Sequence, residues 1–314
     1  MKSLLVSSEG QPGVEPGWSA LSRGSSALDV VESAIRPVES DEGIKSVGRG
    51  GTPDLIGEMA CDAAVMDGDS LAAGSVGALK GALHAVSVAR KVMELLPHVM
   101  LVGDGAQRFA REVGAEETEL LTEPARSKYL EWLEEHVPAE TRQSWPTSRL
   151  AEHAWAAARS LDTKGTVVVL ARDDRGGIAA GTSTSGWAYR YPGRLGDSPA
   201  IGAGLYADSR YGACGCTHVG EMTIRAGTAR SVVLYMKHGM SVEEACREAM
   251  RDLAELKGGF LGTVVVHAID AGANPCVLAN SDIGGGMEYH YWREDMPKPE
   301  HRVARLFAEQ KTAR

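Results

Sequence analysis

The chain has 314 residues, of which 43% are hydrophobic and 24% are charged, and its formal net charge at pH 7 is −9. This composition excludes a disordered, collagen-like or low-complexity chain, and the negative charge argues against nucleic acid as the main partner. No apolar run is long enough to span a membrane, and residues 4–6 are too short for a signal-peptide core, so we expect a cytoplasmic protein without a membrane partner. Its five cysteines are therefore expected to be reduced thiols.

Strand and helix patterns alternate along the first hundred residues. Residues 1–6 read as a first strand. A capping pattern at residues 26–29 predicts the start of a helix that carries Leu28, Val31 and Ile35 on one face. Residues 82–96 predict a further helix, which ends at Pro97, and residues 98–102 then favour a strand.

The stretch 137–162 differs from the rest of the chain. It is polar, contains Pro138 and Pro146, and has one alanine-rich helical piece at 150–160. Composition alone would make it a linker between two domains. The other interpretation is a processing region within a single domain.

The second half contains the most apolar strand candidates. Residues 166–170 and 263–266 are β-branched runs of the kind that is buried on both faces of a sheet. Residues 177–184 and 275–280 look like their hairpin partners. A second capping pattern, at 241–244, predicts a helix with an apolar face. The alternation of strands and helices indicates an α/β fold.

Hydroxyl-rich and glycine-rich turns gather at predicted strand ends between residues 162 and 221. Their sequences are Asp-Thr-Lys-Gly at 162–165, Gly-Thr-Ser-Thr-Ser-Gly at 181–186, Pro-Gly-Arg-Leu-Gly-Asp-Ser-Pro at 192–199 and Cys-Thr-His-Val-Gly-Glu at 216–221. Small residues let a ligand approach the backbone closely. Arg194 offers a planar fork for a carboxylate and Asp197 accepts from an ammonium group, so the pair suits an α-amino acid.

This set of turns, in this order, resembles the threonine-dependent asparaginase family, and its glycosylasparaginases in particular, which are N-terminal nucleophile hydrolases. The similarity extends over most of residues 1–295 and includes the glycine-rich segment 46–54 and the segment 97–106. The resemblance implies a four-layer αββα sandwich, no cofactor and no metal. It also implies that residues 1–314 form one domain that cuts itself between Asp162 and Thr163, giving an α chain of 1–162 and a β chain of 163–314. Two such αβ units would form a dimer.

The resemblance also implies the reaction and its nucleophile. Thr163, once it is the first residue of its chain, would attack a β-aspartyl amide with its hydroxyl. Its own α-amino group, with a pKa of about 8, would accept the hydroxyl proton. The implied substrate is a small amino-acid amide, most closely N4-(N-acetylglucosaminyl)asparagine.

The remaining roles carry over by position. Thr184 would orient Thr163. Thr217 and the backbone N–H of His218 would form the oxyanion hole. Arg194 would bind the substrate α-carboxylate and Asp197 its α-amino group.

Two departures from the family keep other activities open. The family usually has Gly at the position of His218, and glycosylasparaginases carry Trp where this chain has Glu9. L-asparaginase or isoaspartyl (β-aspartyl) peptidase activity is therefore an alternative. An unprocessed binding protein with the same fold is an alternative of another class.

Simpler interpretations exist for several of these residues. Thr163 alone would be an ordinary strand-start threonine, and Arg194 with Asp197 would be a surface ion pair of little energetic value. Cys214, Cys216 and His218 alternate along a strand as metal ligands could, but no fourth ligand stands at a standard spacing, which favours core cysteines. The glycine clusters near 50 and 203 match neither a dinucleotide fingerprint nor a P-loop.

Overall fold

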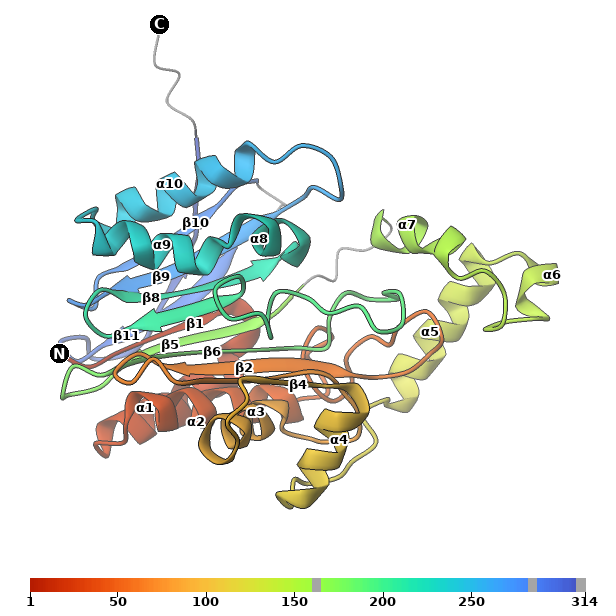
Figure 1. Cartoon of the computed structure of the whole chain (residues 1–314), viewed down its shortest axis with the longest axis horizontal. Helices are drawn as coiled ribbons and strands as arrows, with labels where there is room; N and C mark the ends of the chain where they lie inside the picture. The colour runs from red at the N-terminus through yellow and green to blue at the C-terminus, as the bar shows by residue number, and fades with distance from the viewer. Residues whose placement is uncertain (160–164, 282–286, 309–314) are drawn as a thin grey trace, which may run out of the picture.

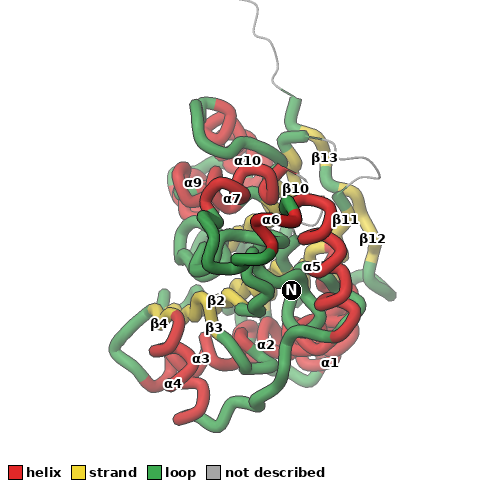
Figure 2. Tube along the Cα trace, turned by 90° about the vertical axis from the view of Figure 1, so that its right-hand side faces the viewer, coloured by secondary structure: helices red, strands yellow, loops and turns green. Residues whose placement is uncertain are grey.

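The protein is a four-layer αββα sandwich, in which two stacked sheets are covered by helices on both outer faces (Figure 1). The computed structural model describes residues 1–159, 165–281 and 287–308. Seen at right angles, the strands lie between a lower helical layer with α1 to α4 and an upper layer with α9 and α10 (Figure 2). The predicted fold is therefore confirmed.

The larger sheet has eight strands within the described residues. In spatial order they are β12 (Glu300–Val303), β11 (Glu288–Arg293), β1 (Ser3–Ser7), β5 (Val167–Arg172), β6 (Ile178–Thr184), β2 (Cys61–Asp67), β3 (Ala73–Leu79) and β4 (Met100–Val102). All neighbours are antiparallel except β3 and β4, which are parallel.

The smaller sheet has five strands in the same part of the chain. Their spatial order is β13 (Arg305–Leu306), β10 (Pro275–Ala279), β9 (Val264–Asp270), β8 (Gly212–His218) and β7 (Leu205–Asp208). Neighbours are again antiparallel, apart from the parallel pair of β10 and β13.

Helices form the outer layers and one projection. Those of the first half of the chain are the short 3-10 helix η1 (Ser8–Gly13), α1 (Val14–Ser22), α2 (Ala27–Ser40), α3 (Ala85–Leu95), α4 (Gly103–Glu112), α5 (Glu123–His136), α6 (Ala139–Arg142) and α7 (Ala151–Arg159). The smaller sheet is covered by α8 (Gly220–Ala226), α9 (Thr228–Lys237) and α10 (Val242–Ala254). In the described part of the chain, none of the helices combines the length and apolarity needed to cross a bilayer.

The strands β5 and β9 begin with unbroken apolar runs because both of their faces are covered. On β5, Val167 and Val169 pack toward the α1–α3 layer, whereas Val168 and Leu170 pack into the core between the sheets. On β9, Val264 and its alternate residues face α8–α10 and Val265 faces the inter-sheet core. Side chains alternate along a strand, so a strand between two cores needs an unbroken apolar run.

The larger sheet interleaves the two halves of the chain. The adjacent strands β5 and β6 come after residue 163, yet they lie between β1 and β2, which come from the first half. Val6 pairs with Val169, and Ala63 pairs with Ser183. The two halves therefore share one continuous hydrogen-bonded sheet and the cores on both of its faces.

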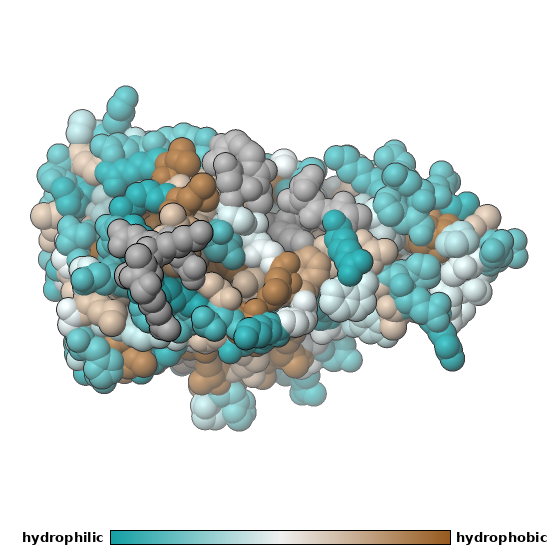
Figure 3. Space-filling view, turned by 90° about the horizontal axis from the view of Figure 1, so that it is seen from above, coloured by the Kyte–Doolittle hydropathy of each residue, from teal (hydrophilic) through white to brown (hydrophobic). Residues whose placement is uncertain are grey.

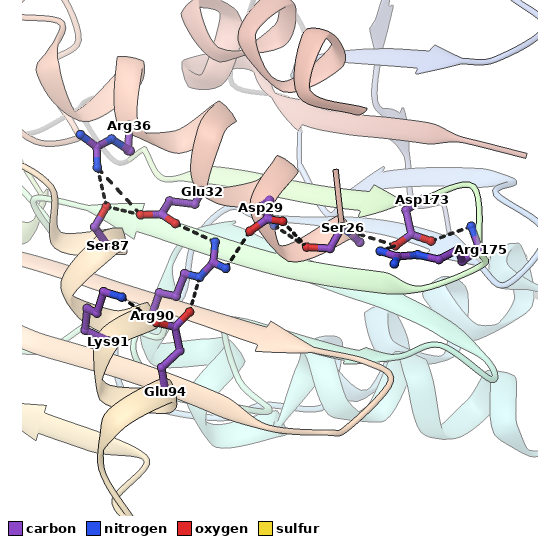
Figure 4. A network of polar contacts seen from close by, with 11 residues as sticks. Ser26, Asp29, Glu32, Arg36, Ser87, Arg90, Lys91, Glu94, Asp173 and Arg175 are labelled. Carbon is purple, nitrogen blue, oxygen red and sulfur yellow. Dashed lines mark hydrogen bonds and ion pairs between the residues drawn. The ribbon is translucent and has the colours of Figure 1, made fainter. Parts of the chain in front are cut away.

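A polar network on the outer side of the sheet links the same two halves (Figure 4). Asp173, which follows β5, accepts a 3.2 Å hydrogen bond from the backbone N–H of Ala27 at the start of α2. From α3, Arg90 pairs with Asp29 at 2.7 Å and with Glu32 at 2.8 Å, both on α2. Each partly exposed ion pair contributes little alone, but the network fixes α2 against α3 and the β5–β6 turn.

Most predicted elements are present, with small shifts at their ends. The hairpins β5–β6 and β9–β10 are confirmed, and α10 begins with the predicted capping box between Ser241 and Glu244. The helix predicted from residue 82 begins at Ala85, because Ala82 forms a β-bridge with Glu117 instead. The strand predicted at 98–102 is β4, shortened to its last three residues.

Residues 137–159, the described part of the unusual stretch, belong to a projection from the sandwich. Helices α5, α6 and α7 extend away from the sheets (Figure 1), and Figure 3 shows that the projection is mostly hydrophilic. The predicted helical piece at 150–160 is α7. A small separate core at residues such as Leu55, Trp132 and Tyr189 attaches the projection to the sandwich.

Candidate active site

The two residues that flank the predicted cleavage point, Asp162 and Thr163, lie outside the described residues. The described chain resumes at Gly165, which is buried, and leads into β5. The hydroxyl of Ser7, at the end of β1, donates to the carbonyl of Thr166 and accepts from the N–H of Val168, both at 3.0 Å. The start of β5 is thereby held beside the end of β1.

Thr184, the last residue of β6, contacts the chain next to the predicted nucleophile. Its hydroxyl oxygen lies 3.0 Å from the carbonyl oxygens of Gly165 and Ser46, and it accepts a 3.0 Å hydrogen bond from the N–H of Gly186. A buried threonine with three polar neighbours is held in one rotamer. Thr184 thus fixes the position of the backbone two residues beyond Thr163.

Glu9 and Ser46 pack against the same glycine. A Cβ atom at Gly165 would lie 2.4 Å from Ser46 Oγ and 2.5 Å from Glu9 Oε1, so only glycine allows this approach. Burial raises the pKa of Glu9, against the lowering effect of hydrogen bonds that include one from Ser8 at 2.9 Å. The carboxyl group found in place of the family tryptophan therefore lies close to the start of β5.

Thr217 and His218 end β8, in register with Val265 and Val264 of β9. Thr217 is 2% exposed, and its hydroxyl lies 2.9 Å from Nδ1 of His218. His218 has a φ of 83°, in the left-handed region that glycine adopts at lower cost than other residues. This conformation gives a physical reason for the usual glycine at this position, and it shows that the chain keeps the turn with a histidine.

Arg194 has the geometry of a carboxylate-binding residue. Its Nε and Nη2 donate to the two carboxylate oxygens of Glu221, at 3.0 and 2.9 Å, and its Cζ lies 4.4 Å from the ring centroid of Trp187. The guanidinium is therefore held by its edge and by one face. The alternative of a surface pair between Arg194 and Asp197 is wrong, since the bidentate partner is Glu221 and Asp197 is buried.

Asp197 is 4% exposed and accepts a 2.7 Å hydrogen bond from the hydroxyl of Thr223 on α8. A Cβ atom at Gly220 would lie 2.6 Å from Asp197 Oδ1, so the glycine leaves room for the carboxylate. Burial raises the pKa of Asp197 to about 6, although the Thr223 hydrogen bond and the charge of Arg194 act in the opposite direction. Asp197 forms no ion pair with the described residues, and a buried carboxylate of this kind is suited to bind an ammonium group.

This raised pKa predicts that Asp197→Asn stabilises the protein at neutral pH. The folded-state pKa of about 6 exceeds the ordinary value of 3.8, so the stability contributed by Asp197 falls as pH rises between these values. Asparagine keeps an acceptor for Thr223 without the buried charge. We expect the free energy of unfolding at pH 7 to rise by about 1–3 kcal/mol, measured by chemical denaturation.

The matched control is Asp208→Asn. A hydrogen bond from Arg210 lowers the pKa of Asp208, so removal of that charge should destabilise the protein at pH 7. The gain for Asp197→Asn should shrink as the pH falls toward 4. A loss of stability in the Asp197 variant at pH 7 would contradict this account of the carboxylate.

The loop that carries Arg194 and Asp197 is hydrogen-bonded to the larger sheet. Asp62 of β2 accepts hydrogen bonds from the N–H of Ala78 at 2.8 Å and of Gly196 at 3.2 Å. The Thr182 hydroxyl donates to the carbonyl of Ser198 at 2.8 Å. These contacts place the loop near the start of β2 and the end of β6.

Three further residues complete this arrangement, and none of them has a role in the sequence analysis. Glu221 and Thr223 hold Arg194 and Asp197, and Trp187 donates its indole N–H to the main-chain oxygen of His218 at 3.1 Å. Glu221 lies in a turn that the sequence singles out, but a contact across 27 residues leaves no periodic signal. An aromatic residue directly after a glycine-rich turn is the only sequence signal for Trp187.

The cysteines are core residues. All five are buried free thiols, and Cys214 and Cys216 belong to the core under α8–α10. Within residues 1–159, 165–281 and 287–308, no three His, Cys, Asp or Glu side chains come together as a possible metal site.

Comparisons with known proteins identify the family of this chain. The chain matches the family described as "Asparaginase" over residues 9–281. The N(4)-(beta-N-acetylglucosaminyl)-L-asparaginase of Elizabethkingia miricola is 39% identical over 239 residues, which cover 76% of this chain and 65% of that enzyme, just under two thirds of its length. The isoaspartyl peptidase of Salmonella typhimurium is 37% identical over 287 residues, 89% of this chain and 84% of that enzyme. The plant-type L-asparaginase of Pyrococcus abyssi is 37% identical over 284 residues, 90% of this chain and 88% of that enzyme.

With this fold and these matches, the chain belongs to the asparaginase family of N-terminal nucleophile hydrolases and is an amidohydrolase.

Proposed function

We propose that the chain cuts itself between Asp162 and Thr163 and that the new N-terminal Thr163 hydrolyses β-aspartyl amides. One observation carries this proposal. The carbonyl of Gly165 lies 3.0 Å from the Thr184 hydroxyl, beside Ser46 and Glu9. Two extended residues span about 7 Å, so a nucleophile at position 163 would act close to the end of β6.

The proposed reaction proceeds by acyl transfer. The α-amino group of Thr163 accepts the proton of its own hydroxyl, and the hydroxyl oxygen attacks the amide carbonyl. Thr217 and the N–H of His218 stabilise the oxyanion of the tetrahedral intermediate. The intermediate expels the amine, which takes a proton, and leaves an ester that water hydrolyses to release aspartate.

The proposed substrate contacts use the two charged side chains of the 192–199 loop. Arg194 would bind the α-carboxylate with the edge that holds Glu221 at 2.9–3.0 Å in the structure, so the substrate carboxylate would take the place of that of Glu221. Asp197 would bind the α-ammonium group as an ionised carboxylate. We therefore expect substrate affinity to fall as the pH drops through about 6, the pKa of Asp197.

Glycosylasparagine is our first candidate substrate, by similarity to the Elizabethkingia enzyme. Asparagine and isoaspartyl peptides are the second candidate, and Glu9 favours them. A carboxyl group at the start of β5 replaces the aromatic wall that a sugar would contact. Hydrolysis rates for glycosylasparagine, asparagine and a β-aspartyl dipeptide, measured side by side, decide between the two candidates.

The two fragments are expected to stay together after cleavage. Strands β5 and β6 of the second fragment pair with β1 and β2 of the first, and Asp173 bonds to Ala27 across the same boundary. A denaturing gel should show two bands, while gel filtration in native buffer should give one peak that contains both. Fragments that elute separately without denaturant would contradict the shared core.

An intact chain would instead favour the unprocessed binding protein. It would give a single band of 33.3 kDa and no hydrolysis of any of the three substrates. An assembly of two αβ units and a cytoplasmic location stay predictions.

A further inference from the structure

We infer that Trp187 is a positioning residue that couples the carboxylate-binding side chain Arg194 to the oxyanion turn at His218. The inference rests on the proposed function, which gives Arg194 and His218 their roles. Trp187 is 9% exposed and follows the Thr184–Gly186 turn at the end of β6. Its indole uses two different parts, an N–H edge and a π face, for two different partners.

The edge of the indole holds the oxyanion turn. Nε1 donates to the main-chain oxygen of His218 at 3.1 Å. His218 has a φ of 83°, and a non-glycine residue in this strained region keeps its conformation only when its surroundings hold it there. On the next residue, the N–H of Val219 donates to the carbonyl of Thr263 at 3.0 Å. The indole and Thr263 therefore fix the peptide plane between His218 and Val219, directly after the N–H of His218 that is proposed to bind the oxyanion.

The face of the indole holds Arg194. The guanidinium carbon lies 4.4 Å from the ring centroid, within the range of a favourable cation–π contact. A stacked guanidinium keeps its N–H edge available for a carboxylate, here that of Glu221. Phe260 packs against the indole at 5.0 Å between centroids, which limits how far Trp187 can turn.

These two contacts fix one distance that the reaction depends on. In a β-aspartyl substrate, the α-carboxylate and the scissile carbonyl are separated by a short fixed chain of carbons. The site must therefore keep Arg194 and the oxyanion turn at a matching separation, and a small misplacement lowers the rate. Trp187 contacts the guanidinium of Arg194 and the carbonyl of His218 in that turn, so it sets the separation between them.

Two substitutions separate the two contacts. Trp187→Phe keeps an aromatic face next to Arg194 but removes the N–H, so we expect kcat to fall about tenfold with KM changed less than about threefold. Trp187→Leu removes both contacts, so KM should also rise about tenfold. Phenylalanine should therefore restore KM, relative to leucine, without restoring kcat.

The matched control is Trp292→Phe. Trp292 is as buried as Trp187, and its Nε1 also donates to a main-chain oxygen, that of Met296 at 3.2 Å, on strand β11 at the other side of the sheet. This variant should keep both kcat and KM. Equal losses in the two phenylalanine variants, or an unchanged kcat in Trp187→Phe, would overturn the inference while the proposed function stands.

A second measurement tests the inference without turnover. Hydrogen exchange of the 216–221 turn, followed by mass spectrometry on the purified protein, should be faster in Trp187→Phe than in wild type. The same turn should exchange at the wild-type rate in Trp292→Phe. Unchanged exchange in Trp187→Phe would overturn the inference, even if the protein hydrolyses no amide and the proposed function fails.

Discussion

A Thr163→Ala variant is expected to remain one chain of 33.3 kDa and to lose hydrolysis of β-aspartyl amides by at least about 10³-fold. The reason is that one hydroxyl performs both reactions. In the precursor it attacks the carbonyl of Asp162, and in the mature enzyme it attacks the substrate carbonyl. A denaturing gel and an assay for released aspartate give the two readings.

The control for this prediction is Thr163→Ser. Serine keeps the hydroxyl and the α-amino group, so this variant should still cut itself and turn over substrate, although more slowly. Circular dichroism should give the same spectrum for alanine, serine and wild type. If Thr163→Ala were cleaved or active like the wild type, another residue would have to be the nucleophile.

An Arg194→Lys variant is expected to raise KM about 10- to 100-fold and to change kcat much less. Lysine replaces a planar fork by a point charge, so two parallel hydrogen bonds to the substrate carboxylate cannot form. That loss corresponds to about 1.4–2.8 kcal/mol of binding energy. Lysine also loses the flat contact with the Trp187 ring. Steady-state kinetics with one substrate over a wide concentration range measures the effect.

Arg210→Lys is the matched control for Arg194→Lys. Arg210 forms the same kind of two-point pair, with Asp208 at 2.8 and 2.9 Å, at the end of β7. Its side chain is 64% exposed, and we expect no change in KM. If Arg194→Lys also kept the wild-type KM, the carboxylate of the substrate would have to bind elsewhere.

The layers of the fold could be predicted because a strand that is buried on both faces has an unbroken apolar sequence. The runs at 166–170 and 263–266 are apolar without alternation, and they are the strands β5 and β9 between two cores. Capping side chains marked the starts of α2 and α10, where Ser26 and Ser241 accept N–H bonds as expected. The start of α3 differs from the predicted one because Ala82 pairs with a residue 35 positions away.

The site could be predicted only as a set of residue types. Family resemblance supplied Thr184, Arg194 and Asp197, but contacts between residues about 30 positions apart depend on the packed sheets. The pairing of Arg194 with Glu221 and the bond from Trp187 to His218 are of this kind. The left-handed backbone of His218 is equally invisible in the sequence, because histidine gives no sign of a turn that glycine usually makes.

Intact mass spectrometry of the purified wild-type protein, combined with N-terminal sequencing, tests the central claim most directly. We expect two fragments, residues 1–162 and 163–314, with the second beginning Thr-Lys-Gly-Thr-Val. A single species of 33.3 kDa, or a second fragment that begins at any residue other than Thr163, would contradict the claim.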